Sequence, residues 1–211
     1  AGLRIAFSPA LGHATVDPEI AALVRSAVGV LESLGAQVTE IDPGFDDPAE
    51  TFRRHWFSAA AHMVGAFPLA DREMLDPGLQ EIVAQGAAIT MTEYMEAVAA
   101  RNALGETMSR FHDEYDLLLT PTLPIPAFAA GQEVPDPGSM PRWTNWTPFT
   151  YPFNLTQQPA ATVPCGFTGE GLPAGLQIIG AKDADALVLR AARAYESLCP
   201  FRMPDSPNIQ H

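Results

Sequence analysis

The sequence predicts an α/β protein, and two patterns carry this prediction. Residues 3–41 contain a strand, an amphipathic helix and a second strand, and such a crossover normally joins parallel strands of one sheet. Residues 161–165 and 174–179 form two further strand patterns around a glycine-rich loop, which is typical of a hairpin. With 211 residues, of which 47% are hydrophobic and 18% charged, the chain is long and apolar enough to bury a core without disulfides.

The first unit has clear boundaries. Apolar and other side chains alternate over residues 3–7, which predicts a strand. Asp17 can cap a helix that has Pro18 at its first position, and Gly35 provides the stop. One face of this helix collects Ile20, Leu23, Val24, Ala27, Leu31 and Leu34. Residues 38–41 follow as a short strand.

The middle of the chain is predicted to be helical. Residues 47–89 contain helices broken at Pro68 and at 76–78, with an apolar face made of Phe52, Trp56, Ala59, Ala60 and Met63. Thr90 and Glu93 have the spacing of a capping box, so a longer helix is expected over residues 91–114. The run after it, Asp116 followed by the three leucines 117–119, predicts a buried strand.

Residues 121–160 are rich in proline and aromatic residues. Eleven of the 20 prolines lie between Pro121 and Pro173, and this density argues against regular helix in a long excursion. The candidate substrate-binding residues of the excursion are Trp143, Trp146, Thr147, Phe149, Thr150 and Asn154. Such aromatic and polar side chains could line an apolar pocket with a few polar contacts. They could equally well cover a sheet edge or an absent partner, and the pattern alone does not decide between the two.

A last amphipathic helix is predicted after Asp183, which can cap it, and it ends before Pro200. Its expected apolar face consists of Leu187, Leu189, Ala192, Tyr195 and Leu198.

Charge and composition exclude several classes of partner. Twelve basic and 25 acidic residues give a net charge of −13, which argues against binding to nucleic acid. A run of 18 apolar residues and a basic amphipathic helix are both absent from the sequence, so no membrane contact is predicted. The chain shows no signal peptide, and a cytoplasmic location is expected. The sequence begins almost inside a strand, which suggests an excised piece of a longer protein.

No catalytic group, metal site or cofactor motif emerges from the residues alone. The G-x-S-x-G motif is absent, and Lys182, the only lysine, lies beside acidic residues at the start of a helix and is expected on the surface. His55 and His62 are two helical turns apart and could share a metal ion, but a core or surface role suits them better. Cys165 and Cys199 form no disulfide framework, and Cys165 is expected to be a buried, unreactive side chain.

Several long stretches nevertheless resemble the C-terminal half of the amidase signature family. These are residues 116–122, 149–154, 158–167 and 171–180, together with the opening residues 2–5 and the helix that contains Arg101. Their order and spacing match the family over nearly the whole chain. The resemblance implies one mixed sheet flanked by helices, with residues 1–211 forming a single unit of a larger α/β/α domain.

The resemblance also implies a function and partners. Family members hydrolyse or transfer at amide C–N bonds through a Ser, a second Ser in a cis peptide and a Lys, all in the half that precedes this stretch. This chain alone is therefore expected to be inactive and to supply pocket wall and scaffold. Its expected partners are the N-terminal catalytic half and a small-molecule amide substrate, and a homodimer could cover the surface that the missing half leaves exposed.

The family pattern further bears on the substrate. In the branch that uses glutamine, an Asp stands three residues before the Thr of the T-x-P-x-N motif, and here that position is Thr147. A neutral Thr offers no ionic contact to an amino group, so an apolar or aromatic acyl group is expected instead. Two alternatives remain open: a non-catalytic α/β binding domain derived from the family, and an independent enzyme with a site near His55 and His62.

Overall fold

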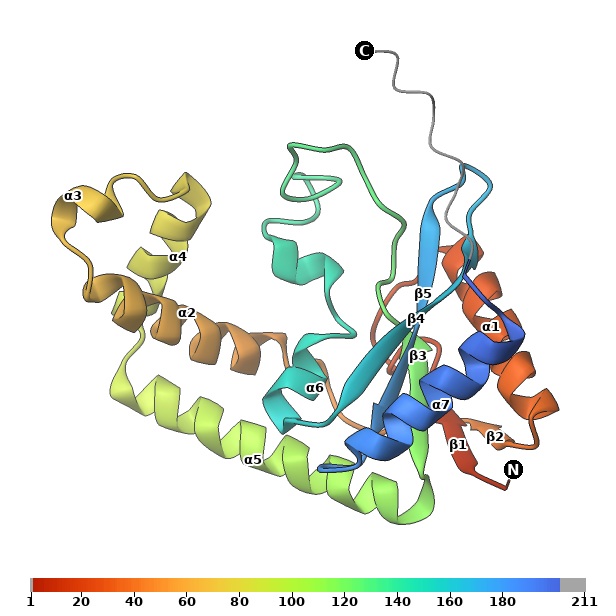
Figure 1. Cartoon of the computed structure of the whole chain (residues 1–211). Coiled ribbons are helices and arrows are strands. Elements are labelled where there is room, and N and C mark those ends of the chain that lie inside the picture. Colours follow the sequence, from red (N-terminus) through yellow and green to blue (C-terminus); the bar gives the residue numbers. More distant parts are fainter. Residues whose placement is uncertain (1, 202–211) are drawn as a thin grey trace.

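The computed structural model describes residues 2–201 and contains a five-stranded mixed sheet with helices on both faces (Figure 1). The strands are β1 (Arg4–Phe7), β2 (Gln37–Glu40), β3 (Leu117–Pro121), β4 (Ala160–Phe167) and β5 (Pro173–Gly180). Their order across the sheet is β2-β1-β3-β5-β4. Strand β1 is parallel to both β2 and β3, whereas β5 is antiparallel to β3 and β4. The predicted α/β class, the parallel crossover and the hairpin are confirmed.

The centre of the sheet is β3, in which all five residues are buried. Leu118 stands opposite Ala6 of β1 and Ile179 of β5 in the register of the sheet. A strand that is covered on both faces is rich in apolar residues, and the three leucines 117–119 have this character.

Helices α1 (Pro18–Ser33) and α7 (Asp185–Leu198) cover one face of the sheet. The Asp17 carboxylate accepts hydrogen bonds from the backbone N–H groups of Glu19 and Ile20, so the predicted N-cap is confirmed. The core on this face collects side chains from both helices and from β1, β3 and β5, among them Ile20, Val24, Leu117, Ile178 and Tyr195.

Helices α5 (Met91–Glu114) and α6 (Tyr151–Thr156) cover the other face. Met108, Phe149 and Phe153 pack there against the residues of β1, β3 and β5 that point away from α1 and α7. The capping box of α5 is confirmed, because the Thr90 and Glu93 side chains each accept a hydrogen bond from the other's backbone N–H.

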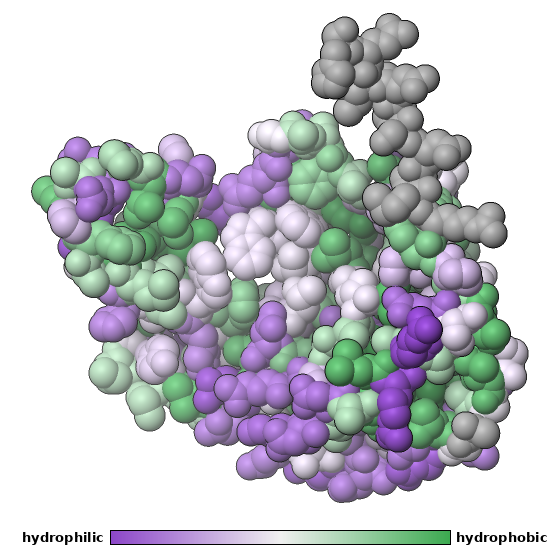
Figure 2. Space-filling view, viewed as in Figure 1, coloured by the Kyte–Doolittle hydropathy of each residue, from purple (hydrophilic) through white to green (hydrophobic). Residues whose placement is uncertain are grey.

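Helices α2 (Ala49–Gly65), α3 (Leu69–Arg72) and α4 (Pro77–Ala88) form an arm that extends away from the sheet (Figure 1). Helices α2 and α4 approach closely at Gly86, where a Cβ atom would lie 2.0 Å from the carbonyl oxygen of Phe57. Exposed apolar side chains are common on the arm, and Figure 2 shows hydrophobic surface mixed with polar surface over α3 and α4.

Two local expectations are wrong. The excursion contains regular structure, namely the 3₁₀ helix η1 (Trp143–Trp146) and helix α6, because Pro152 occupies the first turn of α6, where its missing N–H is not needed. Asp183 does not cap α7: Ala184 is the N-cap residue, and Asp183 has a left-handed backbone conformation (φ 67°).

Two predicted helix faces are also rotated from the observed ones. In α2 the core side includes Phe57 and Val64, while Trp56 and Met63 are exposed. In α7 it includes Val188 and Ala191, whereas the predicted Leu189 and Leu198 are exposed. The error is larger in α2, which lies in the arm and has exposed apolar residues; in α7, the predicted Ala192 and Tyr195 are buried as expected.

Candidate functional site

A buried glutamine fixes the geometry at the carboxyl end of β3. The Gln177 side chain on β5 is 5% exposed, and its amide nitrogen donates to Thr120 Oγ1 (3.0 Å) and to the carbonyl oxygen of Phe149 (2.8 Å). A buried amide of this kind needs its partners, because an unsatisfied polar group inside the protein is costly. The excursion is therefore attached to the sheet immediately before α6.

An apolar groove of about 540 Å³ lies next to this attachment point. It starts where β3 ends, and the chain that leaves β3 forms one wall while β4 and β5 form the floor. The lining residues are Ile20, Thr122, Leu123, Ile125, Pro126, Ala127, Phe128, Trp146, Thr162, Pro164, Pro173, Ala174 and Gly175. None of these carries a charge. A volume of this size and an apolar lining are typical of small-molecule sites.

The floor of the groove has one polar feature. Thr122 Oγ1 donates to Thr162 Oγ1 at 3.2 Å across β5, directly above Gly175. A Cβ atom at position 175 would lie 2.7 Å from Thr122 Oγ1 and 2.8 Å from Thr162 Cγ2, so only glycine leaves room for this pair. The two hydroxyl groups are the polar side chains of the lining.

Two aromatic side chains form the outer wall. The rings of Phe128 and Trp146 meet edge to face, with centroids 5.6 Å apart. The indole Nε1–H of Trp146 donates to the carbonyl oxygen of Glu133 (3.0 Å), which fixes the orientation of the indole ring.

The structure does not bring all six sequence-predicted residues to this groove. Trp146 lines it. Trp143 lies instead against Trp56 of the arm, with ring centroids 5.4 Å apart, and lines a separate pocket with it. Phe149 is completely buried in the core beneath α6, and Asn154 is exposed on α6.

The two threonines hold the segment before α6 together. Thr147 Oγ1 donates to the carbonyl oxygen of Thr144, and Thr150 Oγ1 donates to that of Thr147. Sequence reasoning missed Leu123, Ile125 and Phe128, which line the groove. The signal for them is the extended, proline-containing run 121–128, which places several apolar side chains along one wall.

Within residues 2–201, no serine or cysteine side chain is hydrogen-bonded to a histidine or lysine. Ser8 is fully buried and donates to Asp42 Oδ1 (2.6 Å), a contact that closes the loop after β1. Lys182 forms no hydrogen bond with a described serine. Burial raises the pKa of the Cys165 thiol to about 11, so this side chain stays protonated near neutral pH.

The histidine pair considered from the sequence does not form a metal site. His55 Nδ1 lies 2.9 Å from the carbonyl oxygen of Thr51, while His62 is exposed. In the described part of the chain, no group of three or more His, Cys, Asp or Glu side chains is arranged to hold a metal ion. The helices of that part are also too short or too polar to cross a membrane.

Comparison with known proteins gives a consistent result. The family described as Amidase matches residues 1–189. An acylamidase from Rhodococcus erythropolis is 38% identical over 209 residues, which cover 95% of this chain and 43% of that enzyme. A glutamyl-tRNA(Gln) amidotransferase subunit from Myxococcus xanthus is 46% identical over 114 residues, which cover 54% of this chain and 23% of that protein.

A solved structure of a bacterial aryl acylamidase of the amidase signature family superposes with a TM-score of 0.81 and 27% identity. The match covers 95% of this chain and 44% of that one. The chain thus spans less than half the length of these relatives. The family match along most of the chain, the sequence identity and the shared fold together show that the chain belongs to the amidase signature family.

Proposed function

We propose that this chain is the C-terminal part of an enzyme that hydrolyses amide bonds, and that its apolar groove holds the apolar portion of the substrate. The observation that carries the proposal is the uncharged groove at the carboxyl end of β3. In open α/β sheets, ligands bind beyond the carboxyl ends of the strands, which is where this groove lies. The reacting serine and lysine would come from the remaining half of the protein.

The groove also supports a substrate preference. Glutamine carries a charged amino group, and the lining offers no carboxylate to pair with it. Thr147, at the position of the acidic residue in the glutamine-using branch, already donates its hydroxyl hydrogen to Thr144. Leu123, Ile125, Phe128 and Trp146 would instead favour an aromatic or aliphatic group. An acyl or aryl amide is therefore the proposed substrate class.

In this arrangement the role of the chain is to position the amide substrate. Enclosing the apolar part of an amide between β4, β5 and the aromatic wall would hold its carbonyl carbon in a fixed place for the nucleophile. Such orientation lowers the barrier by removing translational and rotational freedom before the chemical step. Phe149 and Gln177 would act indirectly, since they attach the wall to the sheet.

The first test is the intact mass of the native protein. A mass about twice the 22.6 kDa of this chain would agree with the relatives, of which the chain covers less than half. A native product of 22.6 kDa that supports no amide turnover, alone or with a partner chain, would favour the alternative of a non-catalytic binding domain.

The second test is kinetic and uses the complete enzyme with an aromatic anilide and with glutamine. Trp146→Ala and Phe128→Ala should each raise KM for the anilide by about tenfold or more, as expected for loss of an apolar contact. Trp143→Ala is the matched control, because Trp143 does not line the groove. A preference for glutamine, or an equal effect of the Trp143 variant, would contradict the proposed role of the groove.

Three further expectations remain predictions. They are the requirement for the N-terminal catalytic half, homodimerisation of the isolated chain and a cytoplasmic location. Light scattering of the isolated chain over a dilution series tests the second of these directly.

A further inference from the structure

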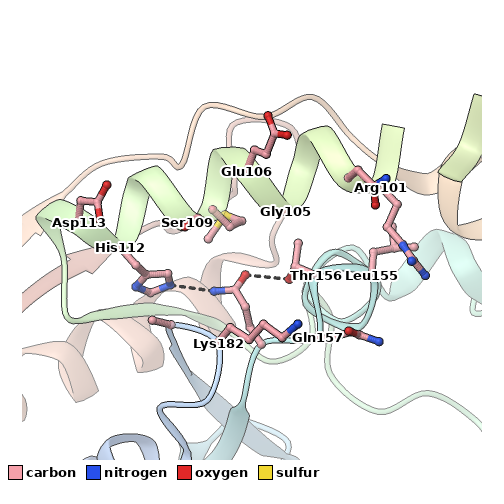
Figure 3. A pocket seen from close by; sticks show the side chains of 14 residues that line it. Arg101, Gly105, Glu106, Ser109, His112, Asp113, Leu155, Thr156, Gln157 and Lys182 are labelled. Carbon is pink, nitrogen blue, oxygen red and sulfur yellow. Dashed lines mark hydrogen bonds between the residues drawn. The ribbon is translucent and has the colours of Figure 1, made fainter. Parts of the chain in front are cut away.

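A second cavity lies on the α5–α6 side of the sheet, away from the apolar groove. It has a volume of about 730 Å³ and lies between α5, the end of α6 and the start of the β5–α7 connection (Figure 3). We call it the α5–α6 cavity; residues 101–113, 155–158 and 181–182 contribute its lining. None of the six predicted substrate-binding residues lines it. Its size suits a small organic molecule.

The floor of the cavity is a neutral, fully paired network. Because the Tyr115 carbonyl can only accept, the contact of 2.9 Å places a hydrogen on His112 Nδ1. His112 Nε2 then accepts from the Gln158 amide at 2.8 Å. Gln158 also donates to the Gly180 carbonyl and accepts from Thr156 Oγ1. Burial lowers the pKa of His112, which keeps its ring neutral.

Two cations of the lining lack an internal counter-ion. Arg101 and Lys182 form neither an ion pair nor a side-chain hydrogen bond with residues 2–201. By contrast, five arginines are paired with carboxylates: Arg4, Arg25, Arg53, Arg54 and Arg142. Arg72, Arg110, Arg190 and Arg193 also have no carboxylate partner within the described residues, but none of them lines the α5–α6 cavity. The lining also contains Glu106 and Asp113, so its formal charge is balanced, but neither carboxylate pairs with the two cations.

The orientation of the side chains concentrates the positive charge. Figure 3 shows Arg101 and Lys182 extending from opposite sides toward Gln157 at the end of α6, whereas Glu106 and Asp113 point away from that place. The paired floor supplies no anion either, so an external anion could satisfy both cations.

We propose that the α5–α6 cavity binds a small organic anion whose carboxylate or phosphate group lies between Arg101 and Lys182. The guanidinium group can bind two anionic oxygens in one plane, and the lysine ammonium adds a point charge from the other side. Met108, Leu155 and Ala181 in the lining provide apolar contact for the body of such a ligand. The site uses none of the groove residues and does not depend on the proposed hydrolysis.

Calorimetric titration of the complete protein that contains this chain tests the proposal, with succinate, inorganic phosphate and the neutral succinamide as probes. Saturable binding of succinate or phosphate, weakened by added salt and absent for succinamide, is expected. Binding of succinate alone would identify the anionic group of the ligand as a carboxylate, and binding of phosphate alone would identify it as a phosphate. Arg101→Gln and Lys182→Gln should each weaken binding about tenfold, whereas Arg193→Gln, which removes the same charge from α7, should leave it unchanged.

A variant that keeps every charge completes the experiment. Gly105 lines the cavity, and a Cβ atom there has no neighbour within 4 Å. Gly105→Leu should therefore fit the helix, project into the cavity and abolish binding while thermal unfolding shows an intact fold. No saturable binding of either anion, or equal losses in the Arg193 and Lys182 variants, would overturn the proposal.

Discussion

Gly86 and Gly105 give a matched test of how closely the helices of this protein approach one another. Both are glycines inside helices, α4 and α5 respectively, and both have ordinary helical backbone conformations. Replacing a helical glycine by alanine should by itself stabilise a protein by about 0.5–1 kcal/mol, because the unfolded chain loses conformational freedom. The surroundings of the two residues differ, so the substitution should stabilise the protein at Gly105 and destabilise it at Gly86.

At Gly86 the new methyl group has no room. Its Cβ would lie 2.0 Å from the Phe57 carbonyl oxygen and 3.1 Å from the Ala61 Cβ. Backbone on both sides must therefore move, and overpacking of this kind costs about 1–3 kcal/mol or more. The net effect of Gly86→Ala should be a destabilisation of at least about 1 kcal/mol. At Gly105 an added Cβ would have no neighbour within 4 Å outside the adjacent backbone of its own helix, so Gly105→Ala should stabilise by about 0.5–1 kcal/mol.

Urea unfolding followed by circular dichroism measures both variants against the parent chain. Limited proteolysis between α2 and α4 should accompany the measurement for Gly86→Ala, because it detects local unfolding of the arm that a global unfolding curve can miss. A Gly86→Ala chain as stable as the parent would refute the close approach of α2 and α4. A destabilised Gly105→Ala chain would refute the open surroundings of Gly105.

Three other predictions concern single side chains. Asp17→Ala should lower the free energy of unfolding by about 1 kcal/mol through loss of the α1 cap, and Asp17→Asn should restore most of it in the same urea titration. Gln177→Leu should cost about 1–3 kcal/mol because the Phe149 carbonyl loses its buried donor, and an unchanged unfolding midpoint would contradict this. Burial depresses the folded-state pKa of His112, so the stability it contributes is complete above the unfolded value near 6.5 and is lost as the pH falls toward the folded value. His112→Gln should weaken the pH dependence of the unfolding midpoint below about pH 6.5, and an equally steep profile would assign the dependence to other groups.

The parts of the fold that the sequence predicted are those fixed by local chemistry. Asp17 with Pro18, and Thr90 with Glu93, identify helix starts because a cap needs particular side chains at fixed spacing. The buried strand β3 and the β4–β5 hairpin follow from their apolar runs in the same way. Helix α6 escapes this reasoning because a high proline count argues against helix in general, although a proline in the first turn is compatible with one.

The candidate site was less predictable, because its geometry depends on long-range packing. Trp143 and Trp146 are three residues apart and look equivalent in the sequence, yet one contacts the arm and the other faces the groove. Phe149 is buried because the Gln177 amide holds its carbonyl against the sheet, a contact across 28 residues. Such contacts leave no local pattern for sequence reasoning to detect.

The outer edge of β4 limits how another chain segment could join this sheet. In the described chain β4 is an end strand, and Pro164 stands at its middle without an N–H to donate, followed by a break in register before Gly166. A strand added along this edge could form a regular ladder only with residues 160–163. Main-chain pairing with a second polypeptide along β4 would therefore be short, whereas this restriction does not apply to β2, the strand at the opposite end of the described sheet. The same interruption also disfavours aggregation of the isolated chain through edge-to-edge pairing of β4 strands.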